Sequence, residues 1–453
     1  MQEFDKIKGE DRVFCAWYLI LGYTFIWMFT ANGPDWCLTV YTIAYAMGVL
    51  LYTCVKGIRP VKESWFWLVI LLAIGIPLGF YSCMWFLQFP VLMLVAAYWT
   101  LAVSGRLLDQ GKTSGWVFFD WWNALGIVPF LNMDAWIRVL FHQNVKLQEN
   151  KLQEKEEGNK MQEHRQECAQ TSILLSGPKA VVLGLGIAAV LLCILLPLLA
   201  SADAGFDRLV GGLTGWVTDW ITGHLFVFAL RMCFAVPVTF YLFGLIYGGL
   251  TDRHTDHIKV AALEKTKKQI RILPVQAMVI AMAVICGVYL LFIGLQGTYL
   301  FSALAGKLPV AFTYAEYARR GFFELCQIAL WNLCILWMAE LFTCQEKNGF
   351  VIIRGMHILL SALTLLLIAT AAGKMLLYIR VYGLTVNRVL PMVFMLWMAF
   401  VFLTWIFHQK RKFPILRISI FAGAILYSAL CVLPVEKLCN LYNLWAQTHG
   451  FLH

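Results

Sequence analysis

Two short segments of the chain hold charged and aromatic residues at spacings that favour a binding site. In residues 313–325, Glu316, Arg320 and Glu324 stand four residues apart. On a helix this spacing stacks acid, base and acid on one face, where the charges can pair. Thr313 followed three residues later by Glu316 is a capping-box pattern, so we expect a helix to begin there.

The second segment, residues 382–388, joins two apolar runs. Gly383 is predicted to end the first run in a left-handed conformation, and Thr385 to cap the helix that follows. Arg388 then falls in the first turn of that helix, where the helix dipole disfavours a cation. We therefore expect Arg388 to pair with one of the two glutamates of the first segment.

Cations outnumber acids around these two segments. Arginine binds phosphate oxygens in bidentate fashion, so a surplus of guanidinium groups favours a phosphate-bearing ligand. We predict a site for an anionic lipid headgroup or a lipid-linked phosphate. The alternative is that these charges only snorkel or pair internally and hold helices together. The candidate ligand-binding residues are Glu316, Arg319, Arg320, Glu324, Lys374, Arg380 and Arg388.

Other chemistry has weaker support in the sequence. Nucleophile arrangements, glycine-rich phosphate loops and paired catalytic carboxylates are not found, so we expect no catalytic residues and no cofactor. Asp252, His254, Asp256 and His257 have the residue types of a metal site, but the group is short and is expected to be a solvated loop. The 13 cysteines form no C-x-x-C pair and indicate small buried hydrophobes rather than a zinc or disulfide framework.

The elements that must position these residues are apolar. The chain is 60% hydrophobic and only 14% charged, which excludes an ordinary water-soluble domain. Runs of about 20 apolar residues, each long enough to cross a bilayer, recur along it. We predict an all-α polytopic membrane protein with about 11 transmembrane helices, near 13–30, 36–55, 64–82, 84–104, 179–200, 224–249, 274–296, 321–343, 356–377, 389–407 and 414–434.

Two further segments are predicted to lie in the membrane interface. Residues 116–141 are rich in Trp and contain a central Pro129 with Asp120, Asp134 and Arg138, which favours two short interfacial pieces or a re-entrant hairpin. Residues 206–221 show an amphipathic helical pattern.

The composition divides the chain into four parts. Residues 1–141 form an N-terminal membrane region with four spans, and 142–178 a polar cytoplasmic linker too poor in apolar residues to fold alone. Residues 179–435 form a core membrane domain with seven spans. Residues 436–453 are predicted to be a C-terminal tail.

Most lysines and arginines fall in alternate short loops. The positive-inside rule then places the N-terminus in the cytoplasm and the C-terminus outside. Orientation therefore explains the net charge of +10 better than nucleic-acid binding does.

The motif Tyr314-Ala-Glu-Tyr-Ala-Arg-Arg-Gly-Phe-Phe-Glu-Leu325, followed by Tyr382-Gly-Leu-Thr385 and Arg388, resembles a family of bacterial multi-pass inner-membrane proteins. That family is catalogued as a domain of unknown function, and the resemblance covers roughly 180–435. It implies a protein of the bacterial cytoplasmic membrane and supplies no activity.

Three functional classes stay open at this point. The first is a binding, sensing or accessory protein that engages an anionic lipid or envelope molecule at the external Arg/Glu site. The second is a transporter or lipid flippase, which would favour broken helices and an inverted repeat. The third is an integral-membrane enzyme acting on a lipid-linked phosphate, which would need a general base at the same site.

Overall fold

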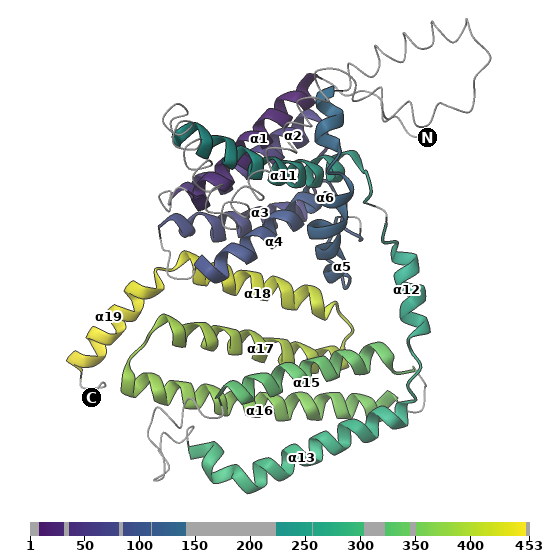
Figure 1. Cartoon of the computed structure of the whole chain (residues 1–453). Coiled ribbons are helices and arrows are strands. Elements are labelled where there is room, and N and C mark those ends of the chain that lie inside the picture. The colour runs from purple at the N-terminus through teal and green to yellow at the C-terminus, as the bar shows by residue number, and fades with distance from the viewer. Residues whose placement is uncertain are drawn as a thin grey trace, which may run out of the picture. The chain divides into compact units, whose positions relative to one another are not determined.

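The computed structural model describes residues 9–30, 36–80, 85–109, 111–141, 223–255, 257–302, 322–344 and 350–449. Apart from two isolated β-bridges, the regular structure of these residues is helical (Figure 1). The predicted fold class, a polytopic α-helical membrane protein, is confirmed.

Ten of the described helices are long and apolar enough to cross a membrane. They correspond to ten of the predicted runs; the run at 179–200, the linker at 142–178 and the amphipathic segment at 206–221 lie outside the described residues. The ten are α1 (Gly9–Thr30), α2 (Trp36–Val55), α3 (Lys62–Gly75) with η1 (Pro77–Gly79), α4 (Trp85–Val103), α11 (Gly223–Thr251), α13 (Val275–Ser302), α15 (Phe322–Phe342), α16 (Phe350–Tyr382), α17 (Val386–Lys410) and α18 (Ile415–Val432).

The Trp-rich segment after α4 is helical but not one straight span. It consists of α5 (Val117–Trp122), a π-helical stretch (Asn123–Ile127) and α6 (Val128–Leu131), then a second piece, Ala135–Phe141, bent by 41° from the first. Two helical pieces are what the polar residues and Pro129 predicted.

The described helices fall into two compact units, each with its own packing. In the first unit, whose described residues fall within 1–37, 44–56 and 128–253, α1 packs against α11. Tyr18 is fully buried there, with its ring 6.1 Å from that of Phe243. Arg231 of α11 donates from Nε to Thr30 Oγ1 of α1 at 2.8 Å.

A buried charge pair also stabilises the first unit. Asp11, 1% exposed, accepts a hydrogen bond from the Tyr52 hydroxyl at 2.9 Å and lies 2.6 Å from Lys56 Nζ. A carboxylate can be buried when its charge is compensated and its oxygens are hydrogen-bonded. Together these contacts join the first turn of α1 to the end of α2.

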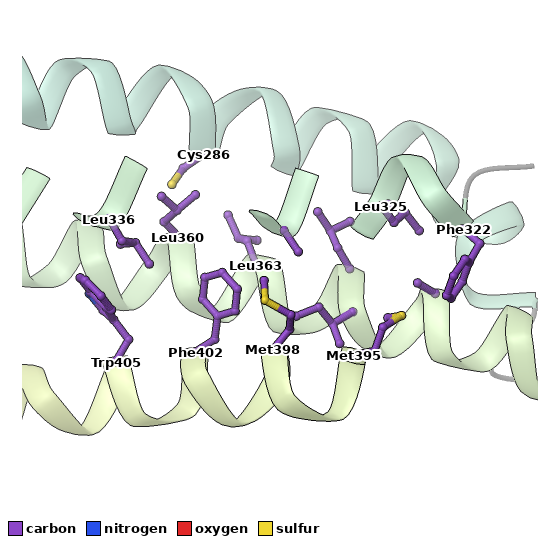
Figure 2. Close-up of a cluster of buried hydrophobic side chains, with 14 of the residues drawn as sticks. Cys286, Phe322, Leu325, Leu336, Leu360, Leu363, Met395, Met398, Phe402 and Trp405 are labelled. Atoms are coloured by element: carbon purple, nitrogen blue, oxygen red, sulfur yellow. The ribbon is translucent and has the colours of Figure 1, made fainter. Parts of the chain in front are cut away.

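The second unit, whose described residues fall within 38–43, 57–127 and 254–453, is built around α16. This helix packs against α13, α15 and α17, while α18 packs against α17 and α3. Apolar side chains fill the space between them, and Figure 2 shows Leu336, Leu363 and Phe402 in this core. Because α16 is covered by three neighbours, polar groups along it gain most from partners inside the bundle, although the buried His357 Nε2 and Ser361 Oγ have none among the described residues.

Three of the polar links across the described part of the second unit join side chains on different elements. Asn332 accepts from the Tyr289 hydroxyl at 2.7 Å and donates to Thr364 Oγ1 at 2.9 Å, which links α15 to α13 and α16. Glu340 of α15 pairs with Lys412, which follows α17, at 3.4 Å.

The third link connects positions 354 residues apart. Glu63, at the start of α3, accepts a hydrogen bond from Arg417 of α18 at 2.6 Å and another from the Thr113 backbone N–H at 2.8 Å. The glutamate side chain is 10% exposed and that of Arg417 is 38% exposed. The second unit thus joins early and late parts of the chain.

Candidate anion-binding site

The turn between α16 and α17 has the conformation that its glycine predicted. Gly383 follows the last residue of α16 with φ of +78°, and its N–H donates to the Ile379 carbonyl at 2.8 Å. The predicted left-handed terminator is therefore confirmed. Thr385 occupies the N-cap position of α17, but its side chain makes no capping hydrogen bond.

Arg388 closes this turn. Its Nη1 group donates to the Tyr382 carbonyl at 2.8 Å and to the Gly383 carbonyl, and its guanidinium lies 4.2 Å from the centre of the Tyr378 ring. The last carbonyls of α16 carry the partial negative charge of the helix dipole, which suits a cation. Within the described residues these carbonyls take the place of the glutamate partner expected from the sequence.

The contacts of Arg388 leave one edge of its guanidinium open. An arginine has five N–H groups, and here the Nη1 group faces the turn. No acceptor among the described residues bonds Nε or Nη2. These two nitrogens form the edge that binds a phosphate or carboxylate side-on with two parallel hydrogen bonds. Arg388 is therefore held in place by the turn and still able to bind an anion.

A helix at the end of the described chain holds the turn from the other side. In α19 (Val435–Thr448), Asn443 accepts from the Leu384 N–H at 2.6 Å and donates to the Leu384 carbonyl at 2.9 Å. The amide thus satisfies both backbone groups of one turn residue. Val435 and Cys439 are buried beside Leu430, which anchors the helix by apolar contact.

Residues 436–453 were predicted to be a tail, and Asn443 was not among the predicted site residues. A signal was present, since Val435, Cys439, Tyr442 and Ala446 recur at spacings of four, three and four residues. This period indicates one apolar face of a helix. The identity of its hydrogen-bond partner had no comparable signal.

The other predicted site residues differ in exposure, and some lie outside the described residues. Lys374 is 1% exposed inside the bundle, close enough to Glu324 for that charge to act on it. Arg380 is exposed in the last turn of α16, and Glu324 is exposed in the first turn of α15. Glu316, Arg319 and Arg320 lie outside the described residues, as does Thr313 with its predicted cap.

An apolar groove begins at this end of the second unit. It has a volume of about 490 Å³ and lies between α15, α17 and α18. Phe322 and Phe323 line it from the first turn of α15, and Leu390 and Pro391 from the start of α17. Its lining continues along α17 to Trp397, about 10 Å further at 1.5 Å per residue.

The groove and the charged groups occupy the same turns of the same helices. Glu324 lies between the lining residues Phe323 and Cys326, and Arg388 stands two residues before Leu390. Apolar walls with a few polar groups at one end are typical of sites for small ligands. Here the arrangement fits a molecule with an apolar chain and an anionic end.

The described residues show no other cluster with obvious site chemistry. No three His, Cys, Asp or Glu side chains among them come together as ligands for a metal ion. His254 and His257 stack on each other, with ring centres 5.6 Å apart.

Comparison with known proteins places this site within a family. A family model described as "Domain of unknown function (DUF4153)" matches residues 66–451. The range begins in α3 and includes every predicted site residue. The match confirms the resemblance to a family of unknown function and extends it toward the N-terminus. None of the curated proteins and none of the solved structures compared with the chain matches it.

Proposed function

The chain belongs to the DUF4153 family, and because that family carries no assigned activity, we propose a function from the site itself. The protein binds an anionic lipid or a lipid-linked phosphate in the membrane. The acidic headgroup lies against the open edge of Arg388, and the apolar chain occupies the groove between α15, α17 and α18.

The observation that carries this proposal is the position of Arg388 relative to the groove. The guanidinium is fixed by two carbonyls and the Tyr378 ring, so little side-chain entropy is lost when a ligand binds. Directly after it, α17 presents apolar walls about 10 Å long. A soluble anion would use only the guanidinium, whereas a lipid would use both.

The surrounding charges favour an acidic headgroup. Arg380 adds a second exposed cation at the end of α16, and the predicted segment with Arg319 and Arg320 directly precedes α15. By the positive-inside rule this end of the bundle faces outward from a bacterial cytoplasmic membrane. The role we propose is therefore a binding, sensing or accessory one at the outer leaflet.

Native mass spectrometry of the purified protein tests this proposal, with phosphatidylglycerol as the anionic probe and phosphatidylcholine as the neutral one. Arg388→Gln removes the charge, and Val393→Trp fills the groove that Val393 lines. Because a charged hydrogen bond contributes about 1.5–3 kcal/mol, Arg388→Gln should weaken phosphatidylglycerol retention about tenfold or more. Val393→Trp should weaken the retention of both lipids.

The matched control is Arg411→Gln, which removes an exposed arginine just beyond the opposite end of α17. It should retain lipids as the wild type does. Thermal melting of each variant identifies those that fold normally, and Arg388→Lys keeps the charge should the glutamine variant be unstable. If folded Arg388→Gln and Val393→Trp proteins retain phosphatidylglycerol like the wild type, the turn is only a structural support and the proposal fails.

A transporter or an enzyme would give different results with the same proteins. A flippase would move a labelled lipid between leaflets of a vesicle, and an enzyme would release phosphate from a lipid-linked substrate. Either activity, if abolished by Arg388→Gln, would replace simple binding as the function of this site.

A further inference from the structure

A strongly basic helix lies outside the site described above. The helix is α12 (Val260–Gln269), which directly precedes α13. Residues 259–271 contain five basic residues, Lys259, Lys265, Lys267, Lys268 and Arg271, against one acidic residue, Glu264. No residue of α12 is buried.

Hydrogen bonds fix the residues that directly follow α12 next to the end of a membrane span, α15. The Leu273 N–H donates to the Phe342 carbonyl at 3.1 Å, and the Cys344 N–H donates to the Leu273 carbonyl at 2.9 Å. The Cys344 thiol donates to the Arg271 carbonyl at 3.1 Å. Since α12 ends at Gln269, α13 begins at Val275 and α15 ends at Phe342, the basic helix ends close to the start of one span and the end of another.

The two sides of α12 differ in exposure. Val260, Leu263, Lys267 and Ile270 are partly covered and follow one helical stripe. Within this stripe, Lys267 Nζ lies 5.7 Å from the centre of the Trp116 ring, a cation–π contact with an aromatic residue of the kind enriched at membrane interfaces.

The remaining lysines are open to a partner. Lys259, Lys265 and Lys268 are exposed, and none of the carboxylates in the described part of the chain forms an ion pair with them. Their charge is therefore not neutralised within the described structure.

We propose that α12 is a lipid-contact surface that binds the anionic headgroups of the leaflet where α13 begins and α15 ends. Clusters of basic residues next to a transmembrane helix are attracted to anionic lipids, and each basic residue strengthens the attraction about fivefold. This attraction acts within a Debye length of about 8–10 Å. Lys268 stands three residues before Arg271, whose carbonyl accepts a hydrogen bond from Cys344 just after α15.

This surface is separate from the groove. The groove starts at the first turn of α15, whereas Leu273, four residues after α12, is bonded to Phe342 in the last turn, and a helix of 21 residues is about 30 Å long. The two sites therefore face opposite leaflets, and a negative result for one proposal does not affect the other.

Hydrogen exchange of the full-length protein in lipid nanodiscs tests the inference. Amides of residues 259–271 are compared between nanodiscs of phosphatidylcholine alone and nanodiscs that also contain phosphatidylglycerol. We expect exchange to be about tenfold slower or more with phosphatidylglycerol, since three exposed lysines contribute. High salt should remove the difference.

The test variant replaces Lys259, Lys265 and Lys268 with Gln, which has a similar helix propensity, so the helix is expected to persist. It should show the same exchange in both kinds of nanodisc. The control, Lys410→Gln with Arg411→Gln, removes exposed charge elsewhere and should retain the difference.

Three outcomes would overturn the inference. The first is equal exchange of wild-type α12 in both nanodiscs, and the second is undiminished protection in the triple variant. The third is slower exchange of the α12 amides only when a soluble polyanion is added, which would indicate that α12 binds an acidic macromolecule instead of lipid.

Discussion

Asn443→Ala is expected to release the turn that holds Arg388. The side chain makes two hydrogen bonds to one residue, accepting from the Leu384 N–H at 2.6 Å and donating to the Leu384 carbonyl at 2.9 Å. Alanine can make neither. The change also weakens the attachment of α19, because Asn443 is the polar contact between this helix and the turn.

The two hydrogen bonds determine the size of the effect. Each contributes about 0.5–1.5 kcal/mol net, so losing both should cost about 2 kcal/mol. That figure corresponds to about a 30-fold increase in the equilibrium constant for local opening. The cost is local, because the apolar core of the second unit does not include Asn443.

Hydrogen exchange measured by mass spectrometry on the protein in detergent reports this opening directly. Amides of the turn at 383–389 and of α19 should exchange about 30-fold faster in Asn443→Ala, while those of α16 keep their rates. The matched control is Asn440→Ala, which removes an exposed asparagine from the same helix. It should leave both segments within about twofold of the wild type, because a surface substitution of this kind changes stability little.

Two results would refute this reasoning. If the turn and α19 exchange at wild-type rates in Asn443→Ala, the amide does not hold them together. If Asn440→Ala accelerates exchange equally, the effect comes from weakened helix propensity and not from the bonds to Leu384.

Three further substitutions test the packing of the second unit by equilibrium unfolding in mixed micelles. Gly383→Ala should lower the free energy of unfolding by about 1–2 kcal/mol, since φ is +78° and a Cβ would lie 2.8 Å from the Asn443 amide oxygen. The control, Gly355→Ala, should raise it by about 0.5–1 kcal/mol, because a Cβ there meets nothing within 4 Å. Equal effects of the two substitutions would contradict the assigned turn. Arg417→Gln should lower the free energy of unfolding by about 1–3 kcal/mol, less than the loss of a fully buried partner would, because Arg417 is 38% exposed. Adding Glu63→Gln should restore part of this loss, since no unpaired carboxylate then remains. Asn332→Ala should lower the free energy of unfolding by about 1–2 kcal/mol, because it removes two interhelical hydrogen bonds. A loss of less than a few tenths of a kcal/mol would show that these bonds do not stabilise the unit.

The helices and the turn were predictable because their signals are local. A run of 20 apolar residues is long enough to span a bilayer wherever it lies in the chain, so ten described spans agree with the sequence. Gly383 was predictable for the same kind of reason, since glycine adopts a left-handed conformation without steric cost. Pro129 and its polar neighbours likewise indicated that 116–141 is not a straight span.

The partners of the charged residues could not be read in this way. Arg388 was expected to pair with a glutamate, but the described structure offers it the carbonyls of its own turn. Lys374 was counted with the site, yet α13, α15 and α17 pack around its helix and bury it. Charge and sequence position alone cannot show which side of a covered helix a residue faces.

The amino-acid sequence by itself determined the membrane class, the helices and the turn chemistry, because hydrophobicity and backbone preference act within a few residues. Only the tertiary structure decided that Glu63 meets Arg417, that Asn443 holds Leu384, and that α15, α17 and α18, with Leu87 of α4, line an apolar groove. These features join residues far apart in the chain. Such pairings depend on which helices pack together, and many different packings satisfy the same pattern of apolar runs.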